Sequence, residues 1–396
     1  MTEVDAPLTR PIVAGVITAL VGVTSSFAVV LTGLDAVGAS PAQAASGLLA
    51  LCVTMGVASI VLSVRYRMPI TSAWSTPGAA VLAASAAVPG GWAAAVGAFL
   101  VSAGLILLTA LWPRLGGMIA RIPPSIAQAM LAGVILPLCI APVSGLVVNP
   151  WGVIPVVVAS LVLLRVAPRW AVPGAFVAAA IVVGVHLART GAALDPASLV
   201  PRLAFTAPQF TWGAVVGVAL PLFLVTMASQ NVPGVAVMRS FGYEVPWRPA
   251  MLVTGLGSAV GSVAGGHAIN LAAISAALAA GPEAGPDPKR RWVAGVSTGA
   301  SALVLGAFSA ALVALVVVAP AAVIPSVAGI ALLATLGAAL QQAVDDPGER
   351  LPAVVTFVVA ASGVAPLGVS AAFWALLAGL LVRAVLHVGR RAHAPR

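Results

Sequence analysis

Charged side chains are scarce in this chain, and acidic ones are the scarcest. Only 7% of the 396 residues are Asp, Glu, Lys or Arg, and ten acidic residues stand against nineteen basic ones. A soluble globular protein carries about 25% charged residues, so the composition excludes a soluble domain. The net charge of +9 does not indicate a nucleic-acid partner, because the basic residues are scattered between apolar runs along the whole length.

Cysteine is almost absent, and the motifs of common enzymes are missing. Cys52 and Cys139 each lie in an apolar run and provide no disulfide framework or metal-ligand spacing. The chain contains no GxxxxGK[ST] loop and no HExxH motif. The glycine-rich run at 255–261 has the wrong spacing for a dinucleotide site and favours close helix packing. An enzyme is therefore disfavoured, and we expect no cofactor and no metal site.

Apolar sequence, in contrast, fills the chain. A membrane-spanning helix needs about 20 apolar residues, and by this rule we predict fourteen spans near 11–33, 44–64, 69–88, 92–112, 122–143, 152–166, 171–188, 210–231, 249–264, 266–281, 292–317, 320–341, 352–364 and 367–388. The first run is too long for a cleaved signal peptide, so we expect it to be retained.

The basic residues support this arrangement. If the N-terminus lies inside, seventeen basic residues fall on the inner side and only Arg189 and Arg202 fall outside. Such an asymmetry is typical of multi-pass proteins of the bacterial cytoplasmic membrane. An even number of spans also returns the C-terminus to the cytoplasm, so we expect both termini there.

The two halves of the chain echo each other. Short segments at 23–27, 69–87 and 122–125 match segments at 225–229, 265–280 and 324–326, in the same order and about 190–200 residues apart. We therefore predict a first repeat over 1–205, with spans 1–7, and a second over 206–396, with spans 8–14. Because seven is odd, the second repeat is inverted. Inverted repeats place a substrate site near the bilayer midplane and suit alternating access.

Spans 3 and 10 cannot be plain helices. The runs PITSAWSTPGAAVLAASAA, from Pro69 to Ala87, and GGHAINLAAISAALAA, from Gly265 to Ala280, each open with an extended stretch. Each then turns into an alanine-rich half-helix, near Pro77 and near Asn270. Non-helical backbone at membrane depth is tolerated only where protein buries it or where it lines a cavity. The two half-helix N-termini, each with about half a positive charge, are expected to face one point and form a cradle for an anion.

Polar and aromatic side chains surround this point in the predicted fold. The candidate substrate-binding residues are Ser25, Ser26, Phe27, Trp74, Ser75, Thr76, Gln230, Asn231, His267 and Asn270. Gln and Asn side chains are costly in hydrocarbon without hydrogen-bond partners, so Gln230 and Asn231 of span 8 are expected to face the protein interior. Pro233 and Gly234, which follow them, are expected to end or break the span 8 helix. The two aromatic side chains suit a flat apolar ligand. The structural alternatives are serines that bond back to their own helix and a tryptophan in the core.

No acidic residue lies deep in a predicted span, which leaves histidine as the ionisable group within the membrane. Of the four histidines, only His267 lies where a broken segment reaches the mid-membrane. Histidine changes charge near physiological pH, so His267 is our candidate proton carrier. Its alternative role is to bond the irregular backbone around Gly265. Glu283, at the inner end of span 10, is a second candidate, for proton exchange.

At these positions the chain resembles the benzoate/proton symporter family of bacteria. The resemblance rests on the strings PITSAWSTPGAA (69–80), LPLFLVTMASQNVPG (220–234), GGHAINLAAISAAL (265–278), GPEAGPDPKRRW (281–292) and SAAFWALLAGL (370–380). It implies proton-coupled uptake of benzoate or a similar aromatic carboxylate across the cytoplasmic membrane. It also implies the fold of uracil-type nucleobase permeases, in which a core of spans 1–4 and 8–11 moves against a gate of spans 5–7 and 12–14, often in a homodimer.

Alternatives to this function stay open at this point. The nucleobase permeases carry glutamates in spans 8 and 10, where this chain has Gln230 and Asn231, and His267 and Asn270. This difference argues against a nucleobase, although a transporter of another organic anion or of a nucleobase on the same fold is the main alternative. A passive channel or an intramembrane enzyme is a third class. Competition between unlabelled ligands separates the first two, and uphill accumulation excludes a channel.

Overall fold

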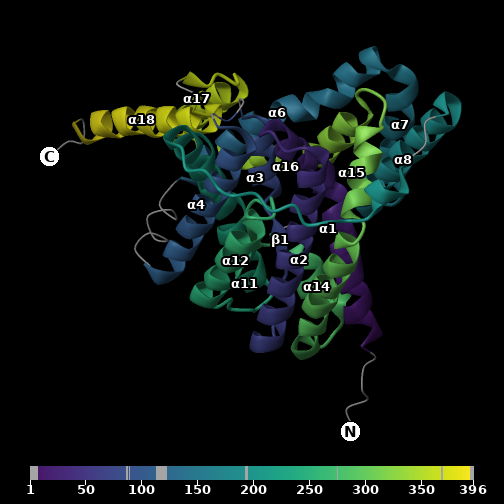
Figure 1. Ribbon diagram of the computed structural model, residues 1–396. Coiled ribbons are helices and arrows are strands. Elements are labelled where there is room, and N and C mark those ends of the chain that lie inside the picture. The colour runs from purple at the N-terminus through teal and green to yellow at the C-terminus, as the bar shows by residue number, and fades with distance from the viewer. Residues whose placement is uncertain are drawn as a thin grey trace, which may run out of the picture.

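Helices dominate the structure, a computed structural model that describes residues 8–85, 88, 90–112, 123–191, 195–273, 275–366 and 369–392. The longer helices are α1 (Thr9–Ala36), α2 (Pro41–Tyr66), α4 (Gly91–Leu111), α6 (Pro124–Val148), α7 (Pro150–Val166), α8 (Ala171–Thr190), α12 (Trp247–Ser262), α14 (Trp292–Gly306), α16 (Val323–Val344), α17 (Arg350–Ala361) and α18 (Ala371–Ala392) (Figure 1).

Shorter elements complete the description. They are β1 (Ser72–Trp74), α3 (Thr76–Ala83), η1 (Pro168–Trp170), η2 (Pro196–Leu199), β2 (Ile269–Leu271), α13 (Ala276–Ala280), η5 (Pro282–Ala284), η6 (Pro288–Arg290) and α15 (Ser309–Val317). From Trp212 to Ser240 the chain is continuously helical, through α9 (Trp212–Ala214), η3 (Val215–Ala219), α10 (Leu220–Thr226), η4 (Met227–Asn231) and α11 (Val232–Ser240).

Local sequence explains where several helices begin. At the start of α2, Ser40 and Gln43 form a capping box, in which the Ser40 amide donates to Gln43 Oε1 at 2.9 Å. Asn149 caps α7 by accepting a hydrogen bond from the Gly152 amide. Proline stands in the first turn of α2, α3, α6 and α7, where its missing N–H is not needed.

The lengths and compositions of the helices fit a membrane protein. Within the described part of the chain, seven helical segments are long and apolar enough to cross a membrane, and the segment from Pro288 through α14 forms an eighth candidate with α15, with a bend of 52°. Each of the fourteen predicted ranges also contains a helix or a strand–helix element. The protein is therefore an all-α polytopic membrane protein apart from one short sheet, as predicted. The number of spans stays a prediction, because α7, α17 and the apolar part of α18 are shorter than a usual span.

Two sets of helices can be distinguished by their contacts. In one set, α14 packs on α1 and α2, α12 packs on α2 and α4, and α3 packs on α1. In the other, α6 packs on α16, α17 and α18, and α7 packs on α8. Figure 1 shows the second set at one end of the view and α2, α12 and α14 at the other. The sets meet where α1 contacts α16 and α8 and where α3 contacts α6.

A two-stranded antiparallel sheet joins the predicted repeats. β1 pairs with β2 in the register Ser72 to Leu271, Ala73 to Asn270 and Trp74 to Ile269. Backbone hydrogen bonds from Ser75 N to Ala268 O at 3.0 Å and from Ala272 N to Thr71 O at 2.9 Å extend the pair at both ends. The extended openings of spans 3 and 10 therefore satisfy each other's backbone groups deep inside the protein.

The outer edge of each strand is satisfied by a serine from a neighbouring helix. Ser59 Oγ, on α2, accepts a hydrogen bond from Ser72 N at 2.8 Å. Ser258 Oγ, on α12, accepts one from Ile269 N at 2.9 Å. Both serines are buried, and they stand at matching places in the two predicted repeats. Buried amides need such partners, so the two hydroxyls close the sheet edges without water.

The structure corrects two local predictions. Asn270 does not start the second half-helix, because residues 269–271 are held in β2 by pairing with β1, and α13 begins only at Ala276. Pro233 and Gly234 do not end the span 8 helix, because the wide turn η4 precedes them and the helix continues to Ser240. In such a turn the backbone bonds are already rearranged, and Pro233 stands early in α11, where it lacks no required donor.

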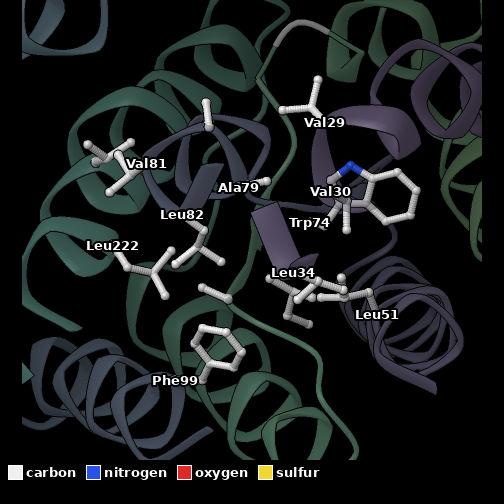
Figure 2. Close-up of a cluster of buried hydrophobic side chains, with 14 of the residues drawn as sticks. Val29, Val30, Leu34, Leu51, Trp74, Ala79, Val81, Leu82, Phe99 and Leu222 are labelled. Carbon is white, nitrogen blue, oxygen red and sulfur yellow. The ribbon is translucent and has the colours of Figure 1, made fainter. Parts of the chain in front are cut away.

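Small residues bring the strand region close to its surroundings. A Cβ atom added to Gly33 of α1 would lie 2.5 Å from Ala79 O of α3, and one added to Gly47 of α2 would lie 2.5 Å from Gly265 O. A cluster of buried apolar side chains also packs in this region. Figure 2 shows Leu34, Leu51, Leu82, Phe99 and Leu222, from five different helices, in this cluster, with Trp74 at one side of it.

Candidate functional site

Trp74 and Ser26 link β1 to the middle of α1. The indole Nε1 of Trp74 donates to Ser26 Oγ at 2.9 Å, and Ser26 Oγ donates in turn to the backbone oxygen of Gly22 at 2.9 Å. Ser25 Oγ also bonds back to Gly22 O, at 3.1 Å. Trp74 and Ser26 are buried, while Ser25 is half-buried. The serines thus do bond back to their helix, and Ser25 is the one with an accessible surface.

Ser75 and Thr76 form the start of α3. Ser75 Oγ caps the helix by accepting from Gly78 N at 3.1 Å, and it accepts a second hydrogen bond from Thr226 Oγ1 at 2.8 Å. Ser75 is fully buried, whereas Thr76 is half-buried. The N-terminus of α3 is therefore already capped, and Thr76 is its exposed polar side chain.

The predicted cradle of two opposed half-helices has only one helix of useful length. α3 has eight residues, but α13 has five and starts five positions after the last residue of β2. A helix N-terminus gathers charge only when several peptide units align behind it. Of the two predicted half-helix ends, only the N-terminus of α3, next to Ser75 and Thr76, therefore has the length that the predicted anion cradle requires.

Asn231 and Gln230 lie in the wide helical turn η4 and face different surroundings. Asn231 is fully buried, its Oδ1 accepts from Leu271 N at 2.9 Å, and its Nδ2 contacts Met227 Sδ at 3.2 Å. It therefore holds the β2 backbone. Gln230 is half-buried, and its side chain makes no hydrogen bond within the described residues. Wide turns of this kind are frequent at functional sites.

His267 and Asn270 carry buried polar atoms that lack partners. Neither ring nitrogen of His267 has a hydrogen-bond partner among the described residues, and the same holds for Asn270 Oδ1. Both side chains are fully buried. The His267 ring meets Phe99 edge-on, with centroids 6.4 Å apart and an interplanar angle of 72°. Buried polar groups are usually satisfied, so these atoms mark a place where a proton, water or ligand is expected to act.

Phe27 and Glu283 lie apart from these residues. The Phe27 ring packs edge-on against Phe176 of α8, with centroids 4.7 Å apart, at the contact between the two helix sets. Glu283, in η5, is exposed and lines a cavity of about 440 Å³ beside the start of α1. The structure therefore brings spans 1, 3, 8 and 10 into contact, but it places the Phe27 ring against α8 and Glu283 in a cavity beside the start of α1.

Several residues of the site escape sequence reasoning. Ser59, Ser258 and Thr226 look like ordinary small polar residues in alanine-rich spans, yet each holds a backbone or hydroxyl group of the strand region. Positions 59 and 258 are 199 residues apart, since 258 − 59 = 199, which is the spacing of the predicted repeats. That spacing is the signal that could have identified them.

One face of α1 opens at the level of the site. Added Cβ atoms at Gly15 and Gly33 would collide with the backbone of α14 and α3, at Ala294 O and Ala79 O, but one at Gly22 would meet nothing within 4 Å. Gly22 stands between Ser25 and Ser26 around the helix and accepts hydrogen bonds from both. Open space therefore adjoins the serines at mid-length of α1.

Known proteins match this chain over nearly its whole length. A family model described as benzoate membrane transport protein matches residues 7–385. The chain is 37% identical over 379 residues to the inner membrane protein YdcO of Escherichia coli (strain K12), covering 95% of this chain and 96% of that protein. It is 29% identical over 378 residues to the benzoate membrane transport protein of Acinetobacter baylyi (strain ATCC 33305 / BD413 / ADP1), covering 94% of both.

Solved structures share the fold at low sequence identity. The transmembrane domain of the cyanobacterial bicarbonate transporter BicA matches with a TM-score of 0.57 and 16% identity, over 96% of this chain and 97% of that one. The structure of SLC26A9 matches with a TM-score of 0.61 and 13% identity, over 97% of this chain and 66% of that one.

Proposed function

Because the chain belongs to the benzoate membrane transport protein family, we propose that it is a secondary active transporter that couples uptake of benzoate or a similar aromatic carboxylate to protons. The coarser part of this statement, a multi-pass membrane transport protein rather than an enzyme, follows from the family. The identity of the substrate, the coupling to protons and the direction of transport are the parts that we propose. One observation supports it most: the partnerless polar atoms of His267 and Asn270 lie beside paired broken segments.

In this proposal the carboxylate lies near the N-terminus of α3. Thr76 and Ser25 are half-buried hydroxyls on this side, with the Gln230 amide from η4 as a third donor. Gly22 leaves open space for the ring next to the serines. Ser26 and Trp74 orient one another through their hydrogen bond, and Asn231 and Ser75 fix the backbone around the ligand.

His267 carries the proton in this proposal. A monoanion that crosses alone meets the membrane potential, at about 2.3 kcal/mol per charge per 100 mV, whereas a proton that moves with it makes the step electroneutral. Glu283 exchanges the proton with the cytoplasm. Both termini lie on that side, and the membrane is the bacterial cytoplasmic membrane. A homodimer is the proposed assembly.

Alternating access follows from the two helix sets. The set containing α1–α4 and α9–α15 corresponds to the proposed core, and the set containing α6–α8 and α16–α18 to the proposed gate. The Phe27–Phe176 contact lies between them. Motion of the core against the gate separates these rings on one side and exposes the site alternately to each face of the membrane.

The test is uptake of labelled benzoate into proteoliposomes, with and without an inward proton gradient. Accumulation that collapses with a protonophore supports the proposal, after subtraction of uptake into protein-free liposomes, because benzoic acid crosses lipid unaided. Uptake no greater than in that control contradicts the substrate assignment.

Another anion or a nucleobase on the same fold is the alternative. Its support is the fold shared with a bicarbonate transporter. Competition by unlabelled bicarbonate, uracil and other carboxylates against benzoate uptake separates the two.

A further inference from the structure

A cavity of about 440 Å³ opens beside the first turns of α1. Four of its lining residues, Arg10, Val13, Ala14 and Ile17, follow the helical spacing i, i+3, i+4 and i+7 and so share one face of α1. Leu278 and Glu283 line it from α13 and η5, and Arg169 lines it from η1. The cavity thus lies between α1 and α13 of one helix set and the turn that leads into α8 of the other.

The same face of α1 leads from this cavity to the central site. Continuing the spacing from Ile17 gives Val21 and then Thr24 and Ser25, which are all half-buried. At 1.5 Å per residue, Ser25 lies about 12 Å along the helix from Ile17. The half-buried face of α1 thus runs from the cavity to Ser25, next to Gly22, where an added Cβ atom would meet nothing within 4 Å.

Two guanidinium groups set the charge of the cavity. Arg10 and Arg169 are both exposed, and neither forms a hydrogen bond or an ion pair with any residue in the described part of the chain. Glu283 lines the same cavity, which leaves one net positive charge. Arginine stays protonated at all physiological pH values and binds carboxylates through two parallel hydrogen bonds.

Apart from Thr9, the rest of the lining is apolar. Val13, Ile17 and Leu278 provide a wall next to the guanidinium groups. A cavity of this volume holds a small ligand, and the pairing of a cationic mouth with an apolar wall matches a molecule with a carboxylate at one end and a ring at the other. A neutral amide of the same ring lacks the charge, and an aliphatic dication has the wrong sign.

We propose that this cavity is a second, entrance-side carboxylate site, in which Arg10 and Arg169 bind the carboxylate and Val13, Ile17 and Leu278 contact the ring. This site rests on the proposed function, because the aromatic carboxylate that it would bind is the substrate of the proposed transport. Because Arg10 and Arg169 belong to different helix sets, a bound carboxylate bridges the sets. The one net positive charge of the lining matches a single monoanion.

The test measures charge and occupancy in the cavity without relying on transport. A single reactive thiol is introduced as Leu278→Cys in the full chain, where the native Cys52 and Cys139 are both buried; the chain without this substitution measures their background. The rates of modification by an anionic sulfonatoethyl and a cationic trimethylammonioethyl methanethiosulfonate are compared. We expect the modification rate with the anionic reagent, divided by the rate with the cationic reagent, to fall about tenfold in Arg169→Gln and in Arg10→Gln. The reason is that a charged cleft raises the local concentration of oppositely charged ions about tenfold or more.

Arg165→Gln is the matched control. Arg165 is exposed at the end of α7, four residues before Arg169, and it does not line the cavity. A fall in the ratio that is as large in Arg165→Gln as in Arg169→Gln overturns the proposal, because the effect is then one of surface charge in general.

Protection by ligand completes the test. Benzoate is expected to slow modification of Leu278→Cys, benzamide is not, and the benzoate effect is expected to disappear in Arg169→Gln. Equal protection by benzamide, or benzoate protection that persists in Arg169→Gln, overturns the site. If benzoate protects the thiol but is not transported in proteoliposomes, the proposed second site is supported and the proposed transport function is contradicted. If benzoate is transported but does not protect the thiol, the transport function is supported and the second site is overturned.

Discussion

Loss of the serine hydroxyls that close the sheet edges is expected to destabilise the protein in a way that can be calculated. Ser59→Ala leaves the Ser72 amide without its acceptor, and Ser258→Ala does the same to the Ile269 amide. An orphaned buried donor costs about 1–3 kcal/mol, because no water reaches these fully buried positions. Each substitution is therefore expected to lower the free energy of unfolding by about 1–3 kcal/mol.

Ser262→Ala is the matched control for this experiment. Ser262 is equally buried and lies one turn after Ser258 on α12, but its hydroxyl only bonds back to Ser258 O at 2.7 Å. Its removal deletes a hydroxyl and orphans no amide, so we expect a loss of less than about 1 kcal/mol. Ser59→Thr, which keeps a hydroxyl, is the conservative variant and is expected to retain most of the stability.

The assay is the midpoint of thermal denaturation of the purified protein in detergent, followed by size-exclusion chromatography. Ser59→Ala and Ser258→Ala should both unfold at clearly lower temperatures than Ser262→Ala. If all three alanine variants unfold together, the reasoning from edge amides is refuted. A lowered midpoint in only one of the two edge variants would refute the equivalence of the two repeats at this position.

Three further predictions concern the central site. His267→Ala is expected to abolish pH-driven accumulation of benzoate while exchange across proteoliposomes persists; unchanged accumulation would remove His267 from the proton role. Trp74→Phe deletes the donor to Ser26 Oγ and is expected to raise the KM for benzoate about fivefold, equivalent to about 1 kcal/mol, with a small change in thermal stability; an unchanged KM would make the bond purely structural. Asn231→Leu orphans the Leu271 amide and should lower thermal stability, whereas Gln230→Leu should reduce transport at nearly unchanged stability; the reverse order would contradict the assigned orientations.

The sequence predicted the first broken segment well because its signals are local. Ser75 and Pro77 define the start of α3 through capping and a fixed backbone angle, and the helix begins where these residues indicate. The clustering of spans 1, 3, 8 and 10 followed from the repeat. The signals for these features lie within short stretches of neighbouring residues, so one sequence is enough to detect them.

The remaining features depend on tertiary pairing. Asn270 has the chemistry of a helix cap, but β1 recruits it into a strand, so α13 starts only at Ala276. Asn231 was predicted to face a ligand or gate, yet its amide is engaged by Leu271 N, a partner 40 positions away. Whether a buried polar side chain contacts the ligand or holds the backbone depends on which strand reaches it, and no periodicity in the sequence records that.

The β1–β2 pair also constrains how the protein is made. Ser72 and its partner Leu271 are separated by 199 positions, since 271 − 72 = 199. At a synthesis rate of about 5–20 residues per second, the first strand emerges roughly 10–40 s before the second. During that interval its backbone groups lie in the nascent membrane domain without their partner, and an unsatisfied peptide group there costs several kcal/mol. The first strand is thus expected to need other partners for its backbone groups until residue 271 has been made.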